Sequence, residues 1–409
     1  MVTKTAARTQ SYGKALALLA TLFFMWGFIS VINNTLLPHL RSVFDLNYTQ
    51  TTLIESIWFI AYGVAAMPAA FLIERVGYKK AIIIGLAVMA VGAAGMVPAA
   101  RLTSFGVTLV SLFVIASGIA LLQVAANPYV AVIGTPETSA SRLTLVQAFN
   151  SAGTSLEGVT LTLEQRAADA QATQLPYILV ALMLVGLAIL ISRSRLPELG
   201  QDTRRANAEE RKHLSLWKHR NLVFGLPAIF LYVLAEIGVA NLFINFVSQP
   251  AIGNMTQATA ANYLILLWMG MMLGRFGGSY LLARFPEGNV LACFALFAML
   301  VMIAAATLNG PAAMWALILV GLGHSIMFPA IFALGIKGLG PLTEEGSGLL
   351  VTAIVGGALV VVQGWLADRY GLQNSFWLTV ACEAYILFYA LWGSKPTHGL
   401  PPEQLDESE

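Results

Sequence analysis

The sequence predicts an all-α membrane protein in which twelve transmembrane helices form two halves of six. The first observation is composition: of 409 residues, 57% are hydrophobic and only 11% are charged, whereas soluble domains carry roughly 25% charged residues. The second is that apolar runs of about 20 residues, the length that crosses a bilayer, recur along the whole chain. The third is a long polar stretch, residues 192–220, which divides these runs into two equal sets.

The apolar runs give the position of each span. The twelve expected spans are residues 15–37, 52–73, 81–100, 105–127, 143–163, 175–192, 221–247, 260–283, 290–308, 312–334, 346–367 and 374–393. We expect the first to be retained, because its apolar run is too long for a signal peptide. The fifth is the weakest, since Glu157 and Glu164 interrupt it and indicate a short or broken helix.

The positive charges predict the orientation of the spans. With the N-terminus inside, 19 of the 23 Lys and Arg residues fall in inner segments. Cytoplasmic segments of membrane proteins are enriched in these residues, so both termini are expected in the cytoplasm. The predicted halves are residues 1–194 and 221–395, with a basic cytoplasmic linker at 195–220 and a cytoplasmic tail at 396–409.

Several classes of function find no support in the sequence. Cys293 and Cys382 lie in separate apolar runs, so they predict neither a disulfide framework nor a metal site. A net charge of +2 gives a nucleic-acid partner no electrostatic support. We find no hydrolase, protease or P-loop motif. We therefore expect no enzyme, no ATP-driven pump and no cofactor.

The first span changes character near its end. Trp26, Asn33 and Asn34 lie in a run that is otherwise apolar, and Pro38 follows Asn34 at i+4. Amides in hydrocarbon must face protein or a water-filled cavity, and Pro removes a helical hydrogen bond there. This pattern favours a solute pathway, and the alternative is a buried amide pair that ties two helices together.

Amides recur at helical spacing in later spans. Three pairs each share one helix face: Gln123 and Asn127, Gln147 and Asn150, and Asn241 and Asn245. In the tenth span, His324 and Phe328 are also expected on one face. Amides offer donors and acceptors to hydroxyl groups, and aromatic rings cover the apolar face of a sugar. Each face alone could join helices, but together they favour a cavity for a neutral polyol.

Carboxylates within the spans are few. Glu55 lies one turn into the second span, where it takes part in transport or caps the helix at the outer interface. Glu236 lies in the seventh span, and Glu383 in the twelfth. Acidic residues inside a membrane are rare and are most often functional.

Five blocks of the sequence resemble one known family. They read FFMWGFISVINNTLLPHL, LLQVAANPYV, LVQAFNSAGT, HSIMFPAIFALGIKGLG and EEGSGLLVTAIVGGALVVVQGWLAD, in order from the first span to the eleventh. These blocks are similar to those of the fucose and glucose/galactose symporter family within the major facilitator superfamily. The loop AAFLIERVGYKK also resembles that superfamily's cytoplasmic loop motif, with Glu74, Arg75, Gly77 and Lys79 at matching places.

The resemblance implies the major facilitator fold and import of a neutral hexose, driven by a cation gradient, across a bacterial inner membrane. Its ligand site lies between the halves, so we expect Trp26, Asn33, Asn34 and the three amide pairs to bind the sugar. Gln123 resembles the glucose/galactose branch, because the fucose branch has a carboxylate there. The expected partners are a sugar, a proton or sodium ion and the lipid bilayer, and we expect a monomer.

Departures from the family pattern bear on coupling. Asn34 stands where the family usually has a coupling Asp, and Gln123 stands where the fucose branch has a Glu, so both positions are neutral here. Glu55 stands where the family tends to have Gln. The coupling candidates are therefore Asn34, Glu55 and Glu236. Two alternatives stay open: a sugar facilitator that is uncoupled or impaired in coupling, and a non-transporting membrane sensor. A sensor would be expected to carry a soluble output domain, and the tail after residue 395 is short.

Overall fold

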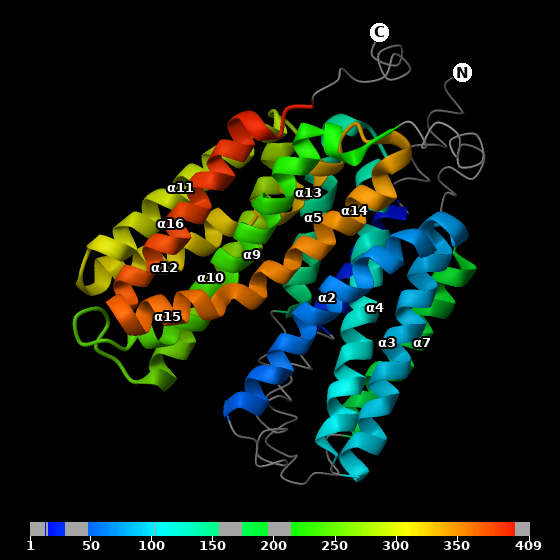
Figure 1. Cartoon of the computed structure of the whole chain (residues 1–409), viewed down its shortest axis with the longest axis horizontal. Coiled ribbons are helices and arrows are strands. Elements are labelled where there is room, and N and C mark those ends of the chain that lie inside the picture. Colours follow the sequence, from blue (N-terminus) through cyan, green and yellow to red (C-terminus); the bar gives the residue numbers. More distant parts are fainter. Residues whose placement is uncertain are drawn as a thin grey trace. The chain divides into compact units, whose positions relative to one another are not determined.

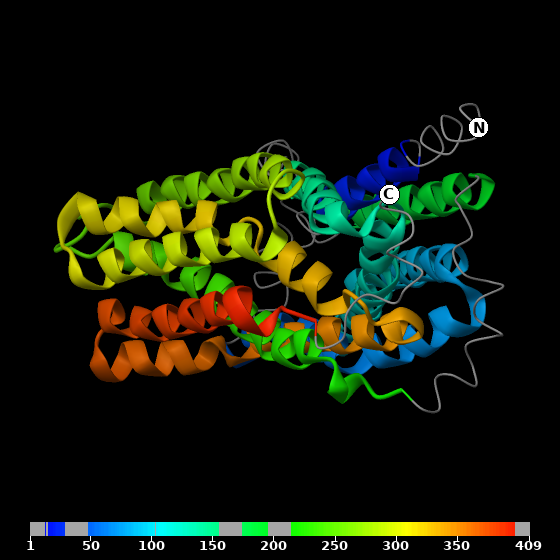
Figure 2. The same ribbon diagram turned by 90° about the horizontal axis from the view of Figure 1, so that it is seen from above.

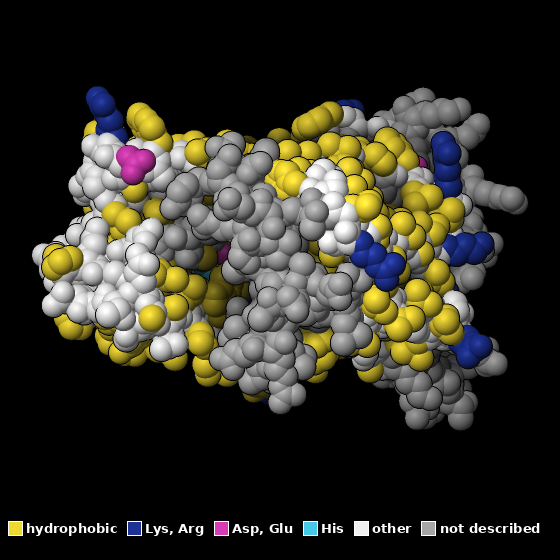
Figure 3. Space-filling view, turned by 90° about the horizontal axis from the view of Figure 1, so that it is seen from below, with side chains coloured by type: hydrophobic (Ala, Val, Ile, Leu, Met, Phe, Trp, Pro, Cys, Tyr) yellow, Lys and Arg dark blue, Asp and Glu magenta, His cyan; other side chains and the backbone are white. Residues whose placement is uncertain are grey.

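The computed structural model describes residues 13, 15–28, 48–102, 104–154, 174–194 and 214–396. Every regular element in these ranges is a helix, which confirms the predicted all-α class. Nine helices in the described ranges are long and apolar enough to cross a membrane, and two shorter apolar helices cover Ala15–Phe28 and Tyr177–Arg193. Hydrophobic side chains are spread over the described surface on the face in Figure 3.

The chain divides into two compact units, and one of the three boundaries between them falls within a helix. Unit 1 comprises Met1–Gly134 and Val146–Arg205, and unit 2 comprises Thr135–Leu145 and Ala206–Glu409. The helix α5 (Ser139–Thr154) thus begins in unit 2 and ends in unit 1. The predicted limits of the halves, linker and tail remain predictions.

Unit 1 is built from closely packed helices. Its main elements are α2 (Tyr48–Val76), α3 (Tyr78–Arg101), α4 (Phe105–Val132), the later part of α5 and α7 (Gln174–Arg193). The helix α3 packs against both α4 and α7, as Figure 1 shows. Glycines let α3 and α4 approach each other closely, because a Cβ on Gly92 would overlap Ile115 and one on Gly118 would overlap the Gly85 carbonyl. Most residues of α4, which carries two of the predicted amides, are buried in this packing.

Unit 2 contains more helices than expected spans, because two of those spans are broken. Its helices are α9 (Arg220–Val247), α10 (Gln257–Leu282), α11 (Glu287–Thr307), α12 (Gly310–His324), α13 (Met327–Ile336), α14 (Thr343–Thr352), α15 (Val360–Tyr370) and α16 (Leu372–Phe388). Figures 1 and 2 both show α15 and α16 side by side. The eleventh expected span becomes α14, a 3-10 segment Ala353–Leu359 and α15.

The break in the tenth expected span has a local cause. The helix α12 ends at His324, and α13 begins at Met327. Pro329 has no N–H to donate to the carbonyl four residues earlier, that of Ser325. The guanidinium of Arg275 supplies a donor instead, with Nε 3.1 Å from Ser325 O. His324 and Phe328 therefore lie on two successive helices, and their expected common face stays a prediction.

Candidate functional site

The amide pair of α4 is buried within unit 1. Gln123 is 7% exposed and Asn127 is fully buried. Gln123 Nε2 donates a hydrogen bond to the hydroxyl of Tyr62 on α2, at 2.7 Å. Tyr62 was not among the predicted site residues, because a lone tyrosine in an apolar span gives no signal of its partner.

Three amide atoms of this pair have no partner among the described residues. They are Gln123 Oε1, Asn127 Oδ1 and Asn127 Nδ2. Most buried polar atoms are hydrogen-bonded, and an unpaired one needs an explanation. These atoms can accept from and donate to the hydroxyl groups of a ligand. We refer to Tyr62, Gln123 and Asn127 as the amide cluster.

The amides of α5 differ in their environment. Gln147 is buried, whereas Asn150 is half-buried and its Nδ2 donates to the Phe23 carbonyl at 2.9 Å. Two glycines let α5 approach the helix Ala15–Phe28 this closely, since a Cβ on Gly27 or Gly153 would overlap a backbone carbonyl of the facing helix. One donor of Asn150 is therefore used to join two helices.

The predicted residues of the first and second spans are described only in part. Trp26 is half-buried, and its ring lies 5.5 Å from that of Phe23. Asn33 and Asn34 fall outside the described residues, and Glu55 lies in α2 with its side chain outside the described ones. Their predicted roles therefore stay predictions.

The amides of the seventh expected span are placed differently from those of unit 1. Asn241 and Asn245 are both exposed on α9. Their common face is consistent with the predicted spacing, and neither belongs to a buried cluster. Glu236, on the same helix, is half-buried and interacts electrostatically with Tyr232 and His324.

A buried hydrogen-bonded pair joins α12 and α16 in unit 2. His324 Nε2 and Glu383 Oε1 are 2.6 Å apart, and the two side chains are 1% and 0% exposed. The ring of Tyr232 meets the imidazole edge-on at 5.9 Å. Nothing in the sequence pairs His324 with Glu383, because 59 residues separate them. With Tyr232, Glu236 and Arg275 they form what we call the ionisable cluster.

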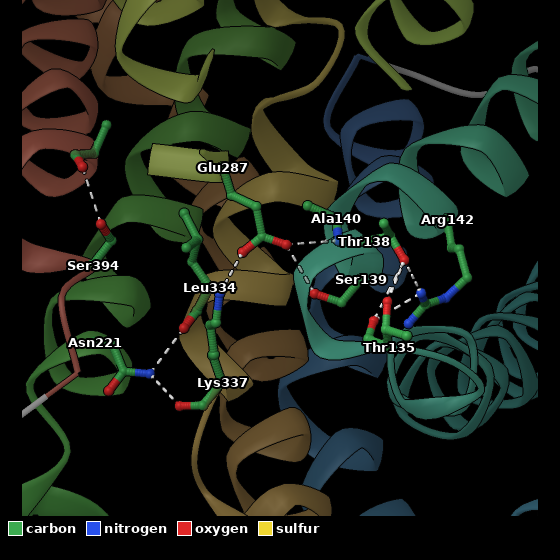
Figure 4. Close-up of polar contacts among 11 residues, drawn as sticks. Thr135, Thr138, Ser139, Ala140, Arg142, Asn221, Glu287, Leu334, Lys337 and Ser394 are labelled. Carbon is green, nitrogen blue, oxygen red and sulfur yellow. Dashed lines mark hydrogen bonds and ion pairs between the residues drawn. The ribbon is translucent and has the colours of Figure 1, made fainter. Parts of the chain in front are cut away.

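A second polar network in unit 2 fixes the start of α5. Figure 4 shows Glu287 between Lys337 and the N-terminus of that helix. Glu287 Oε1 accepts from Ser139 Oγ at 3.0 Å and from Ala140 N at 3.2 Å, and Oε2 accepts from Lys337 Nζ at 3.1 Å. A carboxylate satisfies the free N–H groups and the positive dipole end of a helix. These contacts anchor α5 and have no evident role in binding a sugar.

Known proteins resemble the chain over nearly its whole length. The profile of the Major Facilitator Superfamily matches residues 18–342. The glucose/galactose transporter of Brucella abortus biovar 1 (strain 9-941) is 44% identical over 402 residues, which cover 96% of this chain and 97% of the relative. The L-fucose-proton symporter of Escherichia coli (strain K12) is 33% identical over 423 residues, which cover 96% of both chains.

Solved structures agree with the sequence comparisons. The crystal structure of the transporter FucP in the outward conformation has a TM-score of 0.84 and 32% identity, and the match covers 94% of this chain and all of that one. Identity is higher to the glucose/galactose transporter than to the fucose symporter, which confirms the predicted branch. The chain therefore belongs to the major facilitator superfamily, within its fucose and glucose/galactose symporter family.

Proposed function

We propose that the protein is a secondary active transporter that imports a neutral hexose, glucose, galactose or a close derivative, by cation symport. The observation that carries this proposal is the amide cluster, in which Asn127 and Gln123 hold buried atoms without partners among the described residues. The relatives supply the class of substrate, since they are named for glucose, galactose and L-fucose. The broken helices of unit 2 fit a transporter as well, since transporters bind their ligands at such interruptions.

The chemistry of the amide cluster favours a neutral substrate. Its buried polar groups are amides and a phenol, which pair with hydroxyl groups without requiring a charge. An acidic sugar would need a cation to offset its charge on leaving water. The cluster contains no Lys or Arg, and the buried guanidinium of Arg275 is engaged with the Ser325 carbonyl in unit 2.

The remaining parts of the proposal rest on the charge pattern and the family. A proton is the favoured coupling ion, because the fucose relatives are named as proton symporters. We place the protein in a bacterial inner membrane as a monomer with both termini in the cytoplasm. The neutral side chains of Asn34 and Gln123 favour one alternative, a sugar facilitator without coupling.

Counterflow in proteoliposomes tests the proposal. The purified protein is expected to exchange internal and external D-glucose or D-galactose, with D-gluconate and D-galacturonate as charged controls that are not exchanged. Repeating uptake with an imposed proton or sodium gradient separates symport from facilitation. Exchange of the charged controls at the same rate as the neutral hexoses, or no exchange of any hexose, contradicts the proposed function.

A further inference from the structure

The break in the tenth expected span places a helix end in the middle of a membrane-spanning segment. His324 is the last residue of α12, and the apolar segment that contains the break runs from Gly310 to Ile336. The carbonyl end of a helix carries partial negative charge and stabilises a cation beside it. An imidazole at this position is therefore well placed to hold a proton.

Glu383 approaches this helix end from α16. It lies near the middle of the apolar segment Leu372–Gly393, and its Oε1 is 2.6 Å from His324 Nε2. Its second oxygen, Oε2, is buried without a hydrogen-bond partner in the described parts of the chain. A fully buried carboxylate that leaves one oxygen unpaired is an expensive arrangement if its only purpose is to join two helices.

Charged and titratable groups face the pair from the neighbouring helices. Tyr232 and Glu236 come from α9, and Arg275 comes from α10. Glu236 acts electrostatically on His324, and Glu383 acts on both His324 and Cys382, its neighbour in the sequence. With a neutral imidazole, the two carboxylates and the single guanidinium leave one net negative charge in the cluster.

The other helices that pack against α12 and α16 carry their titratable groups near their ends. Those of α11 are Glu287 and Cys293, in its first two turns. Those of α15 are Asp368, Arg369 and Tyr370, in its last turn, and α13 has none. The net charge at the centre of unit 2 is thus set by the ionisable cluster itself.

We propose that the buried His324–Glu383 pair is the proton-binding site that couples transport, an inference that rests on the proposed sugar import. One proton from the outer solution binds the imidazole, converts the pair into an imidazolium and a carboxylate, and brings the cluster to neutrality. The same proton leaves to the cytoplasm with each sugar. The cost of a buried net charge depends on access of water, so the affinity for the proton changes when the transporter changes its opening.

Neutralising Glu383 tests this assignment in proteoliposomes. The parent protein, Glu383→Gln and the control Asp368→Asn, an exposed carboxylate on α15, are compared with D-galactose or D-glucose, whichever the parent exchanges faster. Three quantities are measured: counterflow without a gradient, accumulation under a proton gradient, and alkalinisation of the medium when sugar is added.

The parent and Asp368→Asn are expected to show all three activities. Glu383→Gln is expected to keep counterflow while its accumulation falls by about tenfold or more and its sugar-dependent alkalinisation disappears. A merely structural pair would lower the three together. Counterflow with undiminished accumulation in Glu383→Gln overturns the inference, whereas absence of counterflow in the parent overturns the proposed function instead.

Two further measurements decide the case in which Glu383→Gln does not fold. His324→Gln retains an amide N–H for Glu383 and is expected to keep counterflow and lose accumulation, whereas Glu383→Asp, which keeps a carboxylate, is expected to retain part of both. Accumulation by His324→Gln equal to that of the parent overturns the inference. So does a parent that exchanges sugar without any alkalinisation.

Discussion

The amide cluster of unit 1 and the ionisable cluster of unit 2 are both buried and polar, yet they are built from opposite chemistry. The first consists of amides and a tyrosine hydroxyl, and its charge does not change with pH near neutrality. The second brings two carboxylates, a guanidinium and an imidazole together around a broken helix. If the proposed function holds, the neutral groups of unit 1 recognise a neutral ligand and the titratable groups of unit 2 respond to the proton gradient.

Removing the cation of the ionisable cluster is expected to have the largest effect on stability. Arg275→Leu leaves the Ser325 carbonyl without its donor and the two carboxylates without a counter-charge, so it should cost about 3–5 kcal/mol. Gln123→Leu, in the amide cluster, removes one neutral hydrogen bond and should cost about 1 kcal/mol. Thermal unfolding in detergent measures both, with the exposed Arg284→Leu as the control. Equal losses of stability in Arg275→Leu and Gln123→Leu would show that the charged and the neutral cluster do not differ in their energetics.

A substitution of Asn127 tests whether the amide cluster serves sugar binding or stability. Asn127→Leu replaces a buried amide that lacks partners among the described residues, so the free protein should be as stable as the parent or more stable. Its sugar affinity should fall by about 1–3 kcal/mol. Calorimetry gives the affinity and a thermal scan gives the stability, with Asn374→Ala, an exposed amide of α16, as the control. A loss of stability with unchanged affinity would make Asn127 a structural residue.

Asn34→Asp introduces a titratable group into unit 1, so that titratable groups are no longer confined to the ionisable cluster of unit 2. The variant should accumulate sugar more strongly than the parent by roughly tenfold, equivalent to about 1.4 kcal/mol, and its binding should weaken as the pH rises and the new carboxylate ionises. Glu55→Gln and Glu236→Gln test whether either acid already contributes. Uptake against a gradient at several pH values is the measurement. Strong accumulation by the parent, unchanged by any of these three substitutions, would exclude all three residues as coupling groups.

Substitutions of the α5 amides should have the smallest effects, one on stability and the other on sugar affinity. Asn150→Ala removes the bond to the Phe23 carbonyl and should cost about 1 kcal/mol of stability. Gln147→Ala should instead weaken sugar binding by about 1 kcal/mol or more. Thermal unfolding and binding are measured on both variants. If Asn150→Ala lowers affinity and leaves stability intact, its amide belongs with the ligand and not with the helix contact.

The fold was largely predictable because length and hydropathy are local properties. Apolar runs identified the spans, and within the described residues the helices follow them. The break after His324 was not predicted, although Pro329 follows five positions later in the same expected span. The proline leaves the Ser325 carbonyl without its helical donor, and Arg275, fifty positions earlier, donates to that carbonyl instead. The sequence shows the proline and does not show that partner.

The site was predictable in its residue types and less so in their partners. Spacing put Gln123 and Asn127 on one face, and both are buried on α4. The same spacing for Gln147 and Asn150 did not reveal that Asn150 binds a backbone carbonyl, because this contact depends on two glycines in separate spans. The His324–Glu383 pair was missed for a related reason, since a carboxylate in a span carries no indication of which helix it will face.

The arrangement at Ser325 also constrains how this protein can change over evolutionary time. A substitution of Pro329 by Ala would restore the N–H that the Ser325 carbonyl otherwise lacks, and the guanidinium of Arg275 would then have a competitor for that oxygen. Substitutions at two positions that share a partner do not add independently. Loss of Arg275 should therefore cost less in lineages that have first lost Pro329, because only the counter-charge of the two carboxylates is then removed, so the order in which the two substitutions occur matters.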